Sequence, residues 1–377
     1  MLKARLKNIQ IGKRSAATPL FMPDATRGIV KLTNSLELAS AGVEALVVNT
    51  LHLYLSPGTA IIKKADKTKR NYKKGIHKFM NWDGLILSDS GGFQVFSLIH
   101  KNPKNGKITE EKVIFKSPWD GSKQELSPEK SIQIQFDLGV DMMVCLDDCP
   151  PNEFSREKMK VSIERTLRWA KRCRAEYDRQ VKKRKIRREE RPLLFSVIQG
   201  GPYVNLRKYC AEKLAEIGFD GYGFGARPID KKGNFLEEAL SATAGFIPEE
   251  SWRFGLGIGL PEDILRCARM GWDLFDCVVP TREGRHGKIF RFKNETKNLP
   301  QSGSFNNFYK TFNINNQKFK SDFRPINEKS RLAVLRNYSR GYLHHLFKIK
   351  EPLGPKIASL NNLEFYSELL EKIRSEK

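Results

Sequence analysis

The sequence predicts an α/β protein with a (β/α)8 barrel (TIM barrel), insertions and a C-terminal helical subdomain. Eight short apolar runs recur along the chain, at residues 19–22, 44–48, 84–87, 141–146, 192–198, 219–224, 253–258 and 273–279. Most are too short for core helices and too continuously apolar for strands with one solvated face. Helical stretches lie between many of them. A doubly wound sheet is the structural alternative, but eight parallel units in about 280 residues suit closure into a barrel better.

The helical stretches have recognisable periods and ends. Residues 128–137 and the long stretch 156–182 follow the 3.6-residue period of an amphipathic helix. Residues 261–270 begin with proline at the first helical position and are followed by glycine, which are the usual signals for a start and a stop. Amphipathic stretches return at 332–347 and 363–373, and we expect these helices to pack on the barrel.

The division of the chain follows from these elements and from a change in charge. We expect the catalytic barrel at residues 1–290, a basic insertion at 291–330 and the C-terminal helical subdomain at 331–377. Residues 281–350 contain 16 Lys and Arg against 4 Asp and Glu, so half of the net charge of +24 lies there. Residues 305–316 are rich in Asn and Phe without a clean period, which predicts a long surface insertion.

The composition restricts the class of protein. The 377 residues are 40% hydrophobic and 10% aromatic, which supports a large core and disfavours disorder. The large positive surplus indicates a polyanionic partner. No apolar run approaches the roughly 20 residues of a membrane span, and the first residues contain no apolar signal core, so we expect a cytoplasmic protein. The six cysteines form no CxxC pair and are expected to be reduced thiols.

Polar or small residues follow most of the predicted strands. They are Asn49, Asp89, Asp147 with Asp148, Gln199, Gly225, Gly259 and Asp276. In a parallel barrel the carboxyl ends of the strands meet at one face, where active sites lie. A helix cap or a turn explains any single one of them about as well, but several together favour a site.

Two blocks of sequence carry the chemistry. Asp89 lies in SDSGGFQVFSL (88–98), and Asp276 lies in FDCVVPTREGR (275–285), which also contains two arginines. Two carboxylates with neighbouring arginines at a barrel mouth suit glycosidic-bond chemistry on a phosphate-bearing substrate. One carboxylate would attack the anomeric carbon while the other handles the proton.

The sequence resembles the tRNA-guanine transglycosylase (queuine tRNA-ribosyltransferase) family, most closely its bacterial branch. The similarity covers nearly the whole chain, in FMPDATRGIVKLT (21–33), VVNTLHLYLSPG (47–58), LSDSGGFQVFSL (87–98), LDDC (146–149), VIQGG (197–201), FDGYGFGA (219–226), GLGIGLPEDI (255–264), DLFDCVVPTREGR (273–285), DFRPI (322–326) and NYSRGYLHHLFK (337–348). The resemblance implies exchange of guanine at the anticodon wobble position of tRNA for a free 7-deazaguanine base, in the queuosine pathway. It also implies a homodimer.

The resemblance assigns roles to the matched residues. Asp276 is similar to the nucleophile that bonds covalently to ribose C1′, and Asp89 is similar to the general acid/base. Two displacements at one carbon give net retention, as in a retaining glycosidase. The residues similar to those that bind the base or support the site are Asp147, Gln199, Phe93, Gly225, Ala226, Leu256 and Asn49. Those similar to residues that hold the anticodon loop are Arg282 and Arg285.

The chain departs from the family at its structural zinc site. The family usually carries CxCxxC and a later histidine, and the corresponding positions here are Ser330, Leu332, Leu335 and Asn361. These side chains cannot form a tetrahedral thiolate site, so we predict that the chain binds no zinc and needs no other cofactor. We expect the two leucines to replace the metal by apolar packing.

A second departure lies at the base pocket, where the family pattern is close to xxGGLSVGE. Residues 223–231 read GFGARPIDK, so that Ala226, Arg227 and Lys231 replace a glycine, a leucine and a glutamate. Lys231 does not suit an aminomethyl ammonium group, although Asp230 is an adjacent acid. The incoming base therefore stays open between free queuine, its aminomethyl precursor, a nitrile precursor and an untested variant. Basic insertions at 63–74 and 293–311 are expected to contact phosphates.

Two other functions stay open. A non-catalytic tRNA-binding paralogue that serves as a partner subunit is favoured by the lost zinc ligands and opposed by the presence of both Asp89 and Asp276. A relative that inserts a 7-deazaguanine at another nucleic-acid site is opposed by the PTREGR block.

Overall fold

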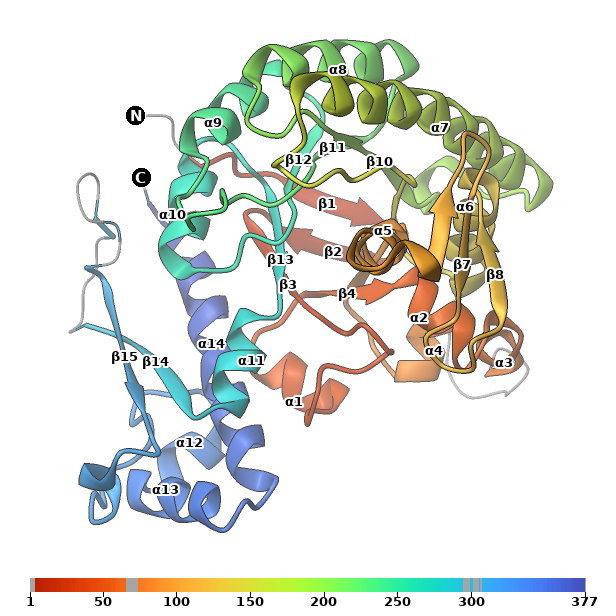
Figure 1. The fold of residues 1–377 in the computed structure, drawn as a ribbon. Coiled ribbons are helices and arrows are strands. Elements are labelled where there is room, and N and C mark those ends of the chain that lie inside the picture. The colour runs from red at the N-terminus through yellow and green to blue at the C-terminus, as the bar shows by residue number, and fades with distance from the viewer. Residues whose placement is uncertain (1–3, 66–73, 294–298, 301–304, 306, 377) are drawn as a thin grey trace.

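The structure, a computed structural model, describes residues 4–65, 74–293, 299–300, 305 and 307–376. Eight parallel strands form one sheet with helices outside it (Figure 1). In sheet order they are β3 (Leu20–Pro23), β13 (Leu274–Cys277), β12 (Trp252–Gly255), β11 (Gly221–Phe224), β10 (Leu193–Ile198), β9 (Met142–Val144), β5 (Leu85–Asp89) and β4 (Ala45–Asn49). A bridge between Asp24 and Val47 joins the two ends of this order. The predicted (β/α)8 barrel is confirmed, and the doubly wound alternative is wrong.

The interior of the barrel is packed with apolar side chains that alternate along the strands. One buried cluster contains Leu20, Met22, Ala45, Val47, Leu85, Leu87, Met142, Val144, Phe195, Val197, Phe254 and Leu274. The hairpin of β1 (Asn8–Ile11) and β2 (Arg14–Ala17), which periodicity did not predict, adds Ile9, Ile11 and Ala16 to it. Arg14 reaches Asp141, just before β9, so the hairpin closes the end of the barrel opposite the carboxyl ends of the strands.

The helices outside the barrel follow the predicted periods closely. α6 (Pro128–Leu138), α7 (Arg156–Lys183) and α10 (Pro261–Arg269) match their predicted ranges to within one residue at each end. Ser127 caps α6 by accepting from the backbone N–H of Lys130 at 3.2 Å. The others are α1 (Ser35–Ser40), α2 (Thr50–Leu55), α3 (Thr59–Lys64), α4 (Gly75–Met80), α5 (Gly92–Lys101), α8 (Val204–Ile217), α9 (Glu237–Phe246) and α11 (Val279–Arg285).

Three predicted strands are too long at their carboxyl ends. The run 141–146 ends as a strand at Val144. The run 253–258 ends as a strand at Gly255, because Gly257 turns the chain with φ 71°. The run 273–279 ends at Cys277, because Val279 already begins α11. An antiparallel sheet of β6 (Gly106–Ile108), β7 (Val113–Lys116) and β8 (Lys123–Leu126), inserted between α5 and α6, was not predicted.

The structure of the region after α11 differs from the prediction. Within the predicted irregular insertion 305–316, β15 (Tyr309–Asn313) pairs antiparallel with β14 (Lys288–Phe292). Phe308 and Ile314 are buried, and the ring of Phe292 lies 4.4 Å from that of Phe365. Aromatic packing thus makes this stretch a hairpin. Parts of the two predicted basic insertions, residues 66–73, 294–298, 301–304 and 306, lie outside the described residues.

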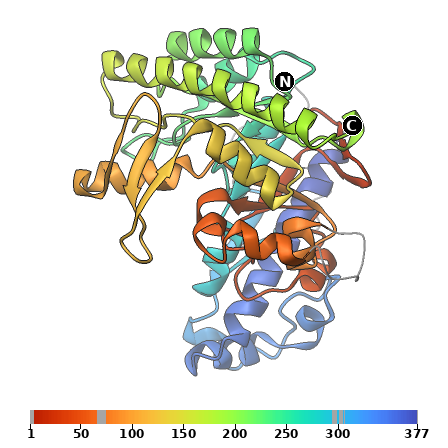
Figure 2. The ribbon, with the colours of Figure 1, turned by 90° about the vertical axis from the view of Figure 1, so that its right-hand side faces the viewer.

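Three helices complete the chain. The predicted helix 332–347 is two helices, α12 (Ala333–Asn337) and α13 (Arg340–Lys348), because Ser339 caps a new start by accepting from the N–H of Tyr342. The predicted 363–373 is the second half of α14 (Leu353–Arg374), which packs on α11 and β3 beside the barrel (Figure 2). Among the described helices, none is long and apolar enough to cross a membrane.

Candidate active site

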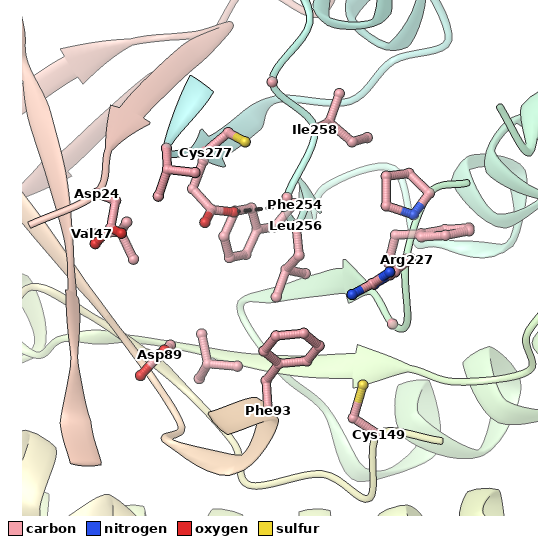
Figure 3. Close-up of a pocket in the computed structure, with 18 of the residues that line it drawn as sticks. Asp24, Val47, Asp89, Phe93, Cys149, Arg227, Phe254, Leu256, Ile258 and Cys277 are labelled. Carbon is pink, nitrogen blue, oxygen red and sulfur yellow. Dashed lines mark hydrogen bonds between the residues drawn. The ribbon is translucent and has the colours of Figure 1, made fainter. Parts of the chain in front are cut away.

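The carboxyl ends of the strands surround a cavity of about 520 Å³ (Figure 3). The predicted site residues that line it are Asn49, Asp89, Phe93, Asp147, Gly225, Ala226, Leu256, Asp276 and Arg282. Gln199 and Arg285 do not line it. Asp89 and Asp276, which lie far apart in the sequence, therefore open into a single cavity.

Asp89 is the carboxylate held by the larger number of hydrogen bonds. Its Oδ2 accepts from Asn49 Nδ2 at 2.6 Å and from Gln94 Nε2 at 3.1 Å, and its Oδ1 accepts from the backbone N–H groups of Thr50 and Gly91 at 3.0 and 3.1 Å. Burial raises the pKa of Asp89 to about 6, although the hydrogen bonds from Thr50, Gln94 and Gly91 act in the opposite direction. A carboxyl group of this pKa can both give and take a proton near neutral pH.

Asp276 is held much more loosely. Among the described residues, only the backbone N–H of Gly257 donates to it, at 2.9 Å from Oδ1. Burial raises the pKa of Asp276 to about 7, and the nearby negative charges of Asp24 and Asp89 act in the same direction. Its second oxygen is left without a donor in the described structure, as a nucleophile requires.

Asp24 is a third carboxylate in the cavity, and the sequence analysis did not single it out. The strand order β13, β3, β4, β5 places Asp276, Asp24, Asn49 and Asp89 at the ends of four adjacent strands. Asp24 Oδ1 accepts from the backbone N–H of Thr26 at 2.6 Å and from its hydroxyl, whereas no described group donates to Oδ2. Asp24 follows the apolar run 19–22 after a single proline, at the end of β3, so the rule that found the other strand-end residues applies to it too.

Asp147 and Gln199 form a buried pair. Gln199 Nε2 donates to Asp147 Oδ2 at 2.6 Å, and Gln199 is fully buried behind the cavity wall. A Cβ atom at Gly225 would lie 2.5 Å from the Gln199 amide, so a glycine is needed there. Burial raises the pKa of Asp147 to about 7, although the Gln199 hydrogen bond opposes this. The neighbouring Asp148 turns away and pairs with Arg165 of α7.

The walls of the cavity suit a flat aromatic ligand. Phe93, in the first turn of α5, is 51% exposed. Figure 3 shows its ring facing the same space as Leu256 from the opposite side. A planar base would fit between two such apolar surfaces, with Asp147 at its edge to accept from its N–H groups.

The loop after β11 places no acidic side chain in the wall of the cavity. Arg227 lines the cavity, and Asn152 Nδ2 fixes the loop by donating to the carbonyls of Arg227 and Ile229 at 3.0 and 2.9 Å. Asp230 and Lys231 do not line the cavity. The oxygens of Asp230 accept from the backbone N–H groups of residues 232 and 234 and from the Asn234 side chain, within their own turn.

Asp263 is a further acidic side chain in the wall of the cavity. It lies in the first turn of α10 and lines the cavity, and no described residue donates a hydrogen bond to its carboxylate. Burial raises the pKa of Asp263 to about 7, and the nearby Glu262 acts in the same direction. The sequence analysis did not single out this residue.

The two arginines of the PTREGR block lie on α11. Arg282 lines the cavity, and Arg285 lies about one helical turn further on. Burial lowers the pKa of Arg285, and the negative charge of Asp24 opposes this. The short helix thus presents cations at the edge of the cavity.

The four positions of the family's zinc ligands do not fit a metal ion. Ser330 Oγ donates to the buried carboxylate of Glu364 at 2.5 Å, and Asn361 Nδ2 donates to the carbonyl of Phe290 at 3.0 Å. Leu332 and Leu335 are buried in the main apolar core. Across the described part of the chain, no three His, Cys, Asp or Glu side chains are grouped to hold a metal, and all six cysteines are free.

Comparison with known proteins agrees with the motifs. A family model for queuine tRNA-ribosyltransferase matches residues 2–376. A queuine tRNA-ribosyltransferase of Natranaerobius thermophilus is 40% identical over 373 residues, which cover 99% of this chain and 90% of the relative. The proteins of the same name from Aliivibrio fischeri and Staphylococcus aureus are 39% identical over 372 residues (99% and 90% covered) and 40% identical over 371 residues (98% and 88% covered). This chain belongs to the queuine tRNA-ribosyltransferase family.

Proposed function

We propose that this chain is a tRNA-guanine transglycosylase, a pentosyltransferase that replaces guanine at the anticodon wobble position with a 7-deazaguanine through a covalent bond between Asp276 and ribose. The observation that carries the proposal is that Asp276 and Asp89 line one cavity, with unequal hydrogen bonding. The family and the names of the relatives support the reaction class.

The first half of the reaction removes guanine. Asp276 attacks ribose C1′ with its free oxygen, the C1′–N9 bond breaks, and the electron pair of that bond leaves with guanine. Asp89 supplies the proton that the departing base needs, and its four hydrogen-bond donors then stabilise the carboxylate that remains.

The second half reverses these steps with the new base. Asp89 takes a proton from the incoming base, whose ring nitrogen attacks C1′ and displaces Asp276. Each step inverts the configuration at C1′, so the product retains it. Asp147 accepts from the N–H edge of either base, while Gln199 fixes the position of Asp147.

In this proposal Asp24 binds the 2′-hydroxyl of the ribose. It stands between the nucleophile and the Asn49–Asp89 pair in strand order, and its Oδ2 receives no hydrogen bond from the described residues. The 2′-hydroxyl is attached next to C1′, so it reaches this oxygen when C1′ lies over Asp276. A carboxylate bound to a sugar hydroxyl beside the reacting carbon strengthens its bond in the transition state and distinguishes RNA from DNA.

Asp263 replaces the missing acid of the base pocket in this proposal. Since Lys231 and Asp230 do not line the cavity, Asp263 is the carboxylate available to the 7-substituent of the incoming base. An ammonium group there would ionise Asp263 and pair with it. The proposed partners are therefore the tRNA anticodon stem-loop and a free 7-deazaguanine with an aminomethyl-type substituent. A cytoplasmic homodimer is also proposed from the family resemblance.

The test is incorporation of labelled guanine into unmodified tRNA by the purified chain. Exchange is expected for the wild type and for Asp120→Ala, an exposed aspartate between β7 and β8, and it should be lost in Asp276→Ala. The wild type should also form an RNA–protein adduct that survives denaturation. Absence of exchange with guanine and every 7-deazaguanine, despite tRNA binding, would refute the proposal in favour of a non-catalytic binding subunit. Exchange only in DNA or at another tRNA position would favour the third function.

A further inference from the structure

The last helix of the chain contacts the wall of the barrel cavity from outside. Tyr366 of α14 is 2% exposed, and its hydroxyl donates to the backbone carbonyl of Gly259. Gly259 lines the cavity in the loop that follows β12. The ring of Tyr366 packs on Phe21 of β3, with ring centroids 4.8 Å apart, so the hydroxyl is presented from a fixed position. No other group in the described structure donates to the Gly259 carbonyl.

The loop that Tyr366 contacts has little stiffness of its own. Residues 255–259 read GLGIG, and Gly257 has φ 71°, a conformation that side-chain-bearing residues rarely adopt. A Cβ atom at Gly259 would lie 2.3 Å from Cβ of Cys277, so only a glycine lets the loop approach β13 this closely. Glycines permit this path without holding the chain in it, so contacts from outside the loop must fix its position.

The position of this loop determines the hydrogen bond to Asp276. The backbone N–H of Gly257 donates to Asp276 Oδ1 at 2.9 Å and is the only described donor to that carboxylate. Cys277, on which Gly259 packs, is the next residue of β13. Figure 3 shows Leu256 and Ile258 of the loop at the same side of the cavity as Cys277. The loop therefore lies between Tyr366 outside the barrel and the end of β13 inside it.

The same face of α14 also holds the segment that follows β13. Asn362 lies four residues before Tyr366, on one face of the helix with it, and is fully buried. Its Nδ2 donates to the carbonyl of Pro280 in α11 at 3.0 Å and to that of Lys288 in β14 at 2.9 Å. α14 thus holds the chain both before and after the strand that carries the nucleophile.

We propose that Tyr366 is a positioning residue for the reaction: its hydroxyl fixes Gly259 and thereby keeps the N–H of Gly257 aligned with Asp276. The inference rests on the proposed function for the role of Asp276 as the nucleophile. A hydrogen bond weakens steeply when its donor leaves the line to the acceptor, and a small displacement at a reacting group is enough to slow a reaction. Tyr366 does not line the cavity, so it acts through the loop and not on the substrate.

The test is Tyr366→Phe, which removes the hydroxyl and keeps the buried ring. Its matched control is Tyr177→Phe in α7. Tyr177 is 1% exposed, and its hydroxyl donates at 2.5 Å to the carbonyl of Pro192, just before the amino end of β10 and away from the cavity. Both variants therefore leave one buried carbonyl without its donor, but only the first lies beside the loop.

Two measurements separate the variants. The pKa of Asp276 should rise in Tyr366→Phe, because the Gly257 hydrogen bond lowers it in the wild type. Carbon-13 NMR of aspartate-labelled chain, assigned with Asp276→Asn, measures this titration. For base exchange, kcat should fall roughly tenfold with KM for tRNA unchanged, and Tyr177→Phe should keep the wild-type values. The titratable groups around Asp276 and the Tyr366 hydroxyl are the same in all three chains, namely Asp24, Asp89, Glu262, Cys277, Glu283 and Tyr309.

Several results would overturn the inference. An Asp276 titration equal to that of the wild type would show that the hydroxyl does not act through Gly257. Equal losses of kcat in the two variants, or unfolding of Tyr366→Phe alone, would assign the hydroxyl a structural role. The two proposals fail separately. A shifted Asp276 titration in Tyr366→Phe, together with a wild type that exchanges no base, would contradict only the proposed function, whereas wild-type exchange with an unshifted titration would contradict only this inference.

Discussion

Replacing Asp276 by asparagine should abolish base exchange and, at alkaline pH, make the protein more stable. The native carboxyl has a pKa of about 7, raised mainly by burial, against an ordinary value of 3.8. Asparagine has nearly the same shape, keeps an oxygen to accept from the N–H of Gly257, and never ionises. The variant therefore removes the charge with little change in packing.

The magnitude follows from the difference between the folded and unfolded pKa. Below pH 3.8 the carboxyl is protonated in both states, so its ionisation costs no stability. Between pH 3.8 and 7 the unfolded chain ionises first, and stability declines until the native group ionises as well. A shift of about three units corresponds to about 4 kcal/mol above pH 7, and about 2 kcal/mol is a better expectation because solvent reaches this half-buried carboxylate.

Urea unfolding at pH 5 and pH 8 measures this effect. The gain in the free energy of unfolding for Asp276→Asn over the wild type should be about 2 kcal/mol at pH 8 and clearly smaller at pH 5. The control is Asp141→Asn, which should destabilise because Asp141 is paired with Arg14 and His77 and accepts from the N–H of Ile86. A gain that does not depend on pH, or a loss at pH 8, would refute the reasoning.

Four further predictions concern the site and the C-terminal region. The kcat/KM profile should be bell-shaped with limbs near pH 6 and 7, and a flat profile between pH 5 and 9 would contradict the assigned acid and nucleophile. Asp24→Asn should reduce the preference for a ribonucleotide over a 2′-deoxynucleotide at the target position roughly tenfold or more, and an unchanged ratio in competition assays would exclude the 2′-hydroxyl contact. Asp263→Asn should reduce the preference for an aminomethyl base over a nitrile base about tenfold, provided that guanine exchange persists as the control; equal ratios would assign the substituent to another group. Glu364→Gln should lower the free energy of unfolding by about 2 kcal/mol, unlike the exposed Glu371→Gln, and equal losses would show that the buried carboxylate has no special role.

Elements with a strong period or an uninterrupted apolar run were predictable from the sequence. Parallel strands buried on both faces are continuous apolar runs, so all eight were found within a few residues. The carboxyl ends of the strands were predicted less accurately, because the residues that follow them, in the turn at Gly257 and at the start of α11, are also apolar. The hairpin at residues 309–313 was missed since its stability comes from distant contacts, above all the packing of Phe292 on Phe365. Local sequence does not contain that information.

The site was predictable where position along a strand determines direction. Aspartates that directly follow parallel strands must lie at one face, and this rule placed Asp89 and Asp276 in one cavity. Asp24 directly follows β3 and satisfies the same rule, although it was not predicted. Asp263 could not be found in this way, because the turn of α10, and not a strand end, brings it to the cavity. The burial of Gln199 behind Asp147 likewise depends on packing against Gly225.

The hydrogen bonds of the two central carboxylates also determine how the free enzyme distributes one proton. Asp89 has four donors and a pKa of about 6, and Asp276 has one donor and a pKa of about 7. The better-held group ionises more readily, so the form with Asp276 ionised and Asp89 protonated is the less abundant of the two singly protonated forms. The proposed reaction requires the rarer form. A bound substrate would donate its 2′-hydroxyl to Asp24, and its C1′ would become positively charged in the transition state. Both effects would stabilise the ionised form of Asp276. The proton would therefore move to Asp89 only when the ribose is bound. Such an arrangement would protect the cavity from an unpaired nucleophilic anion until RNA binds.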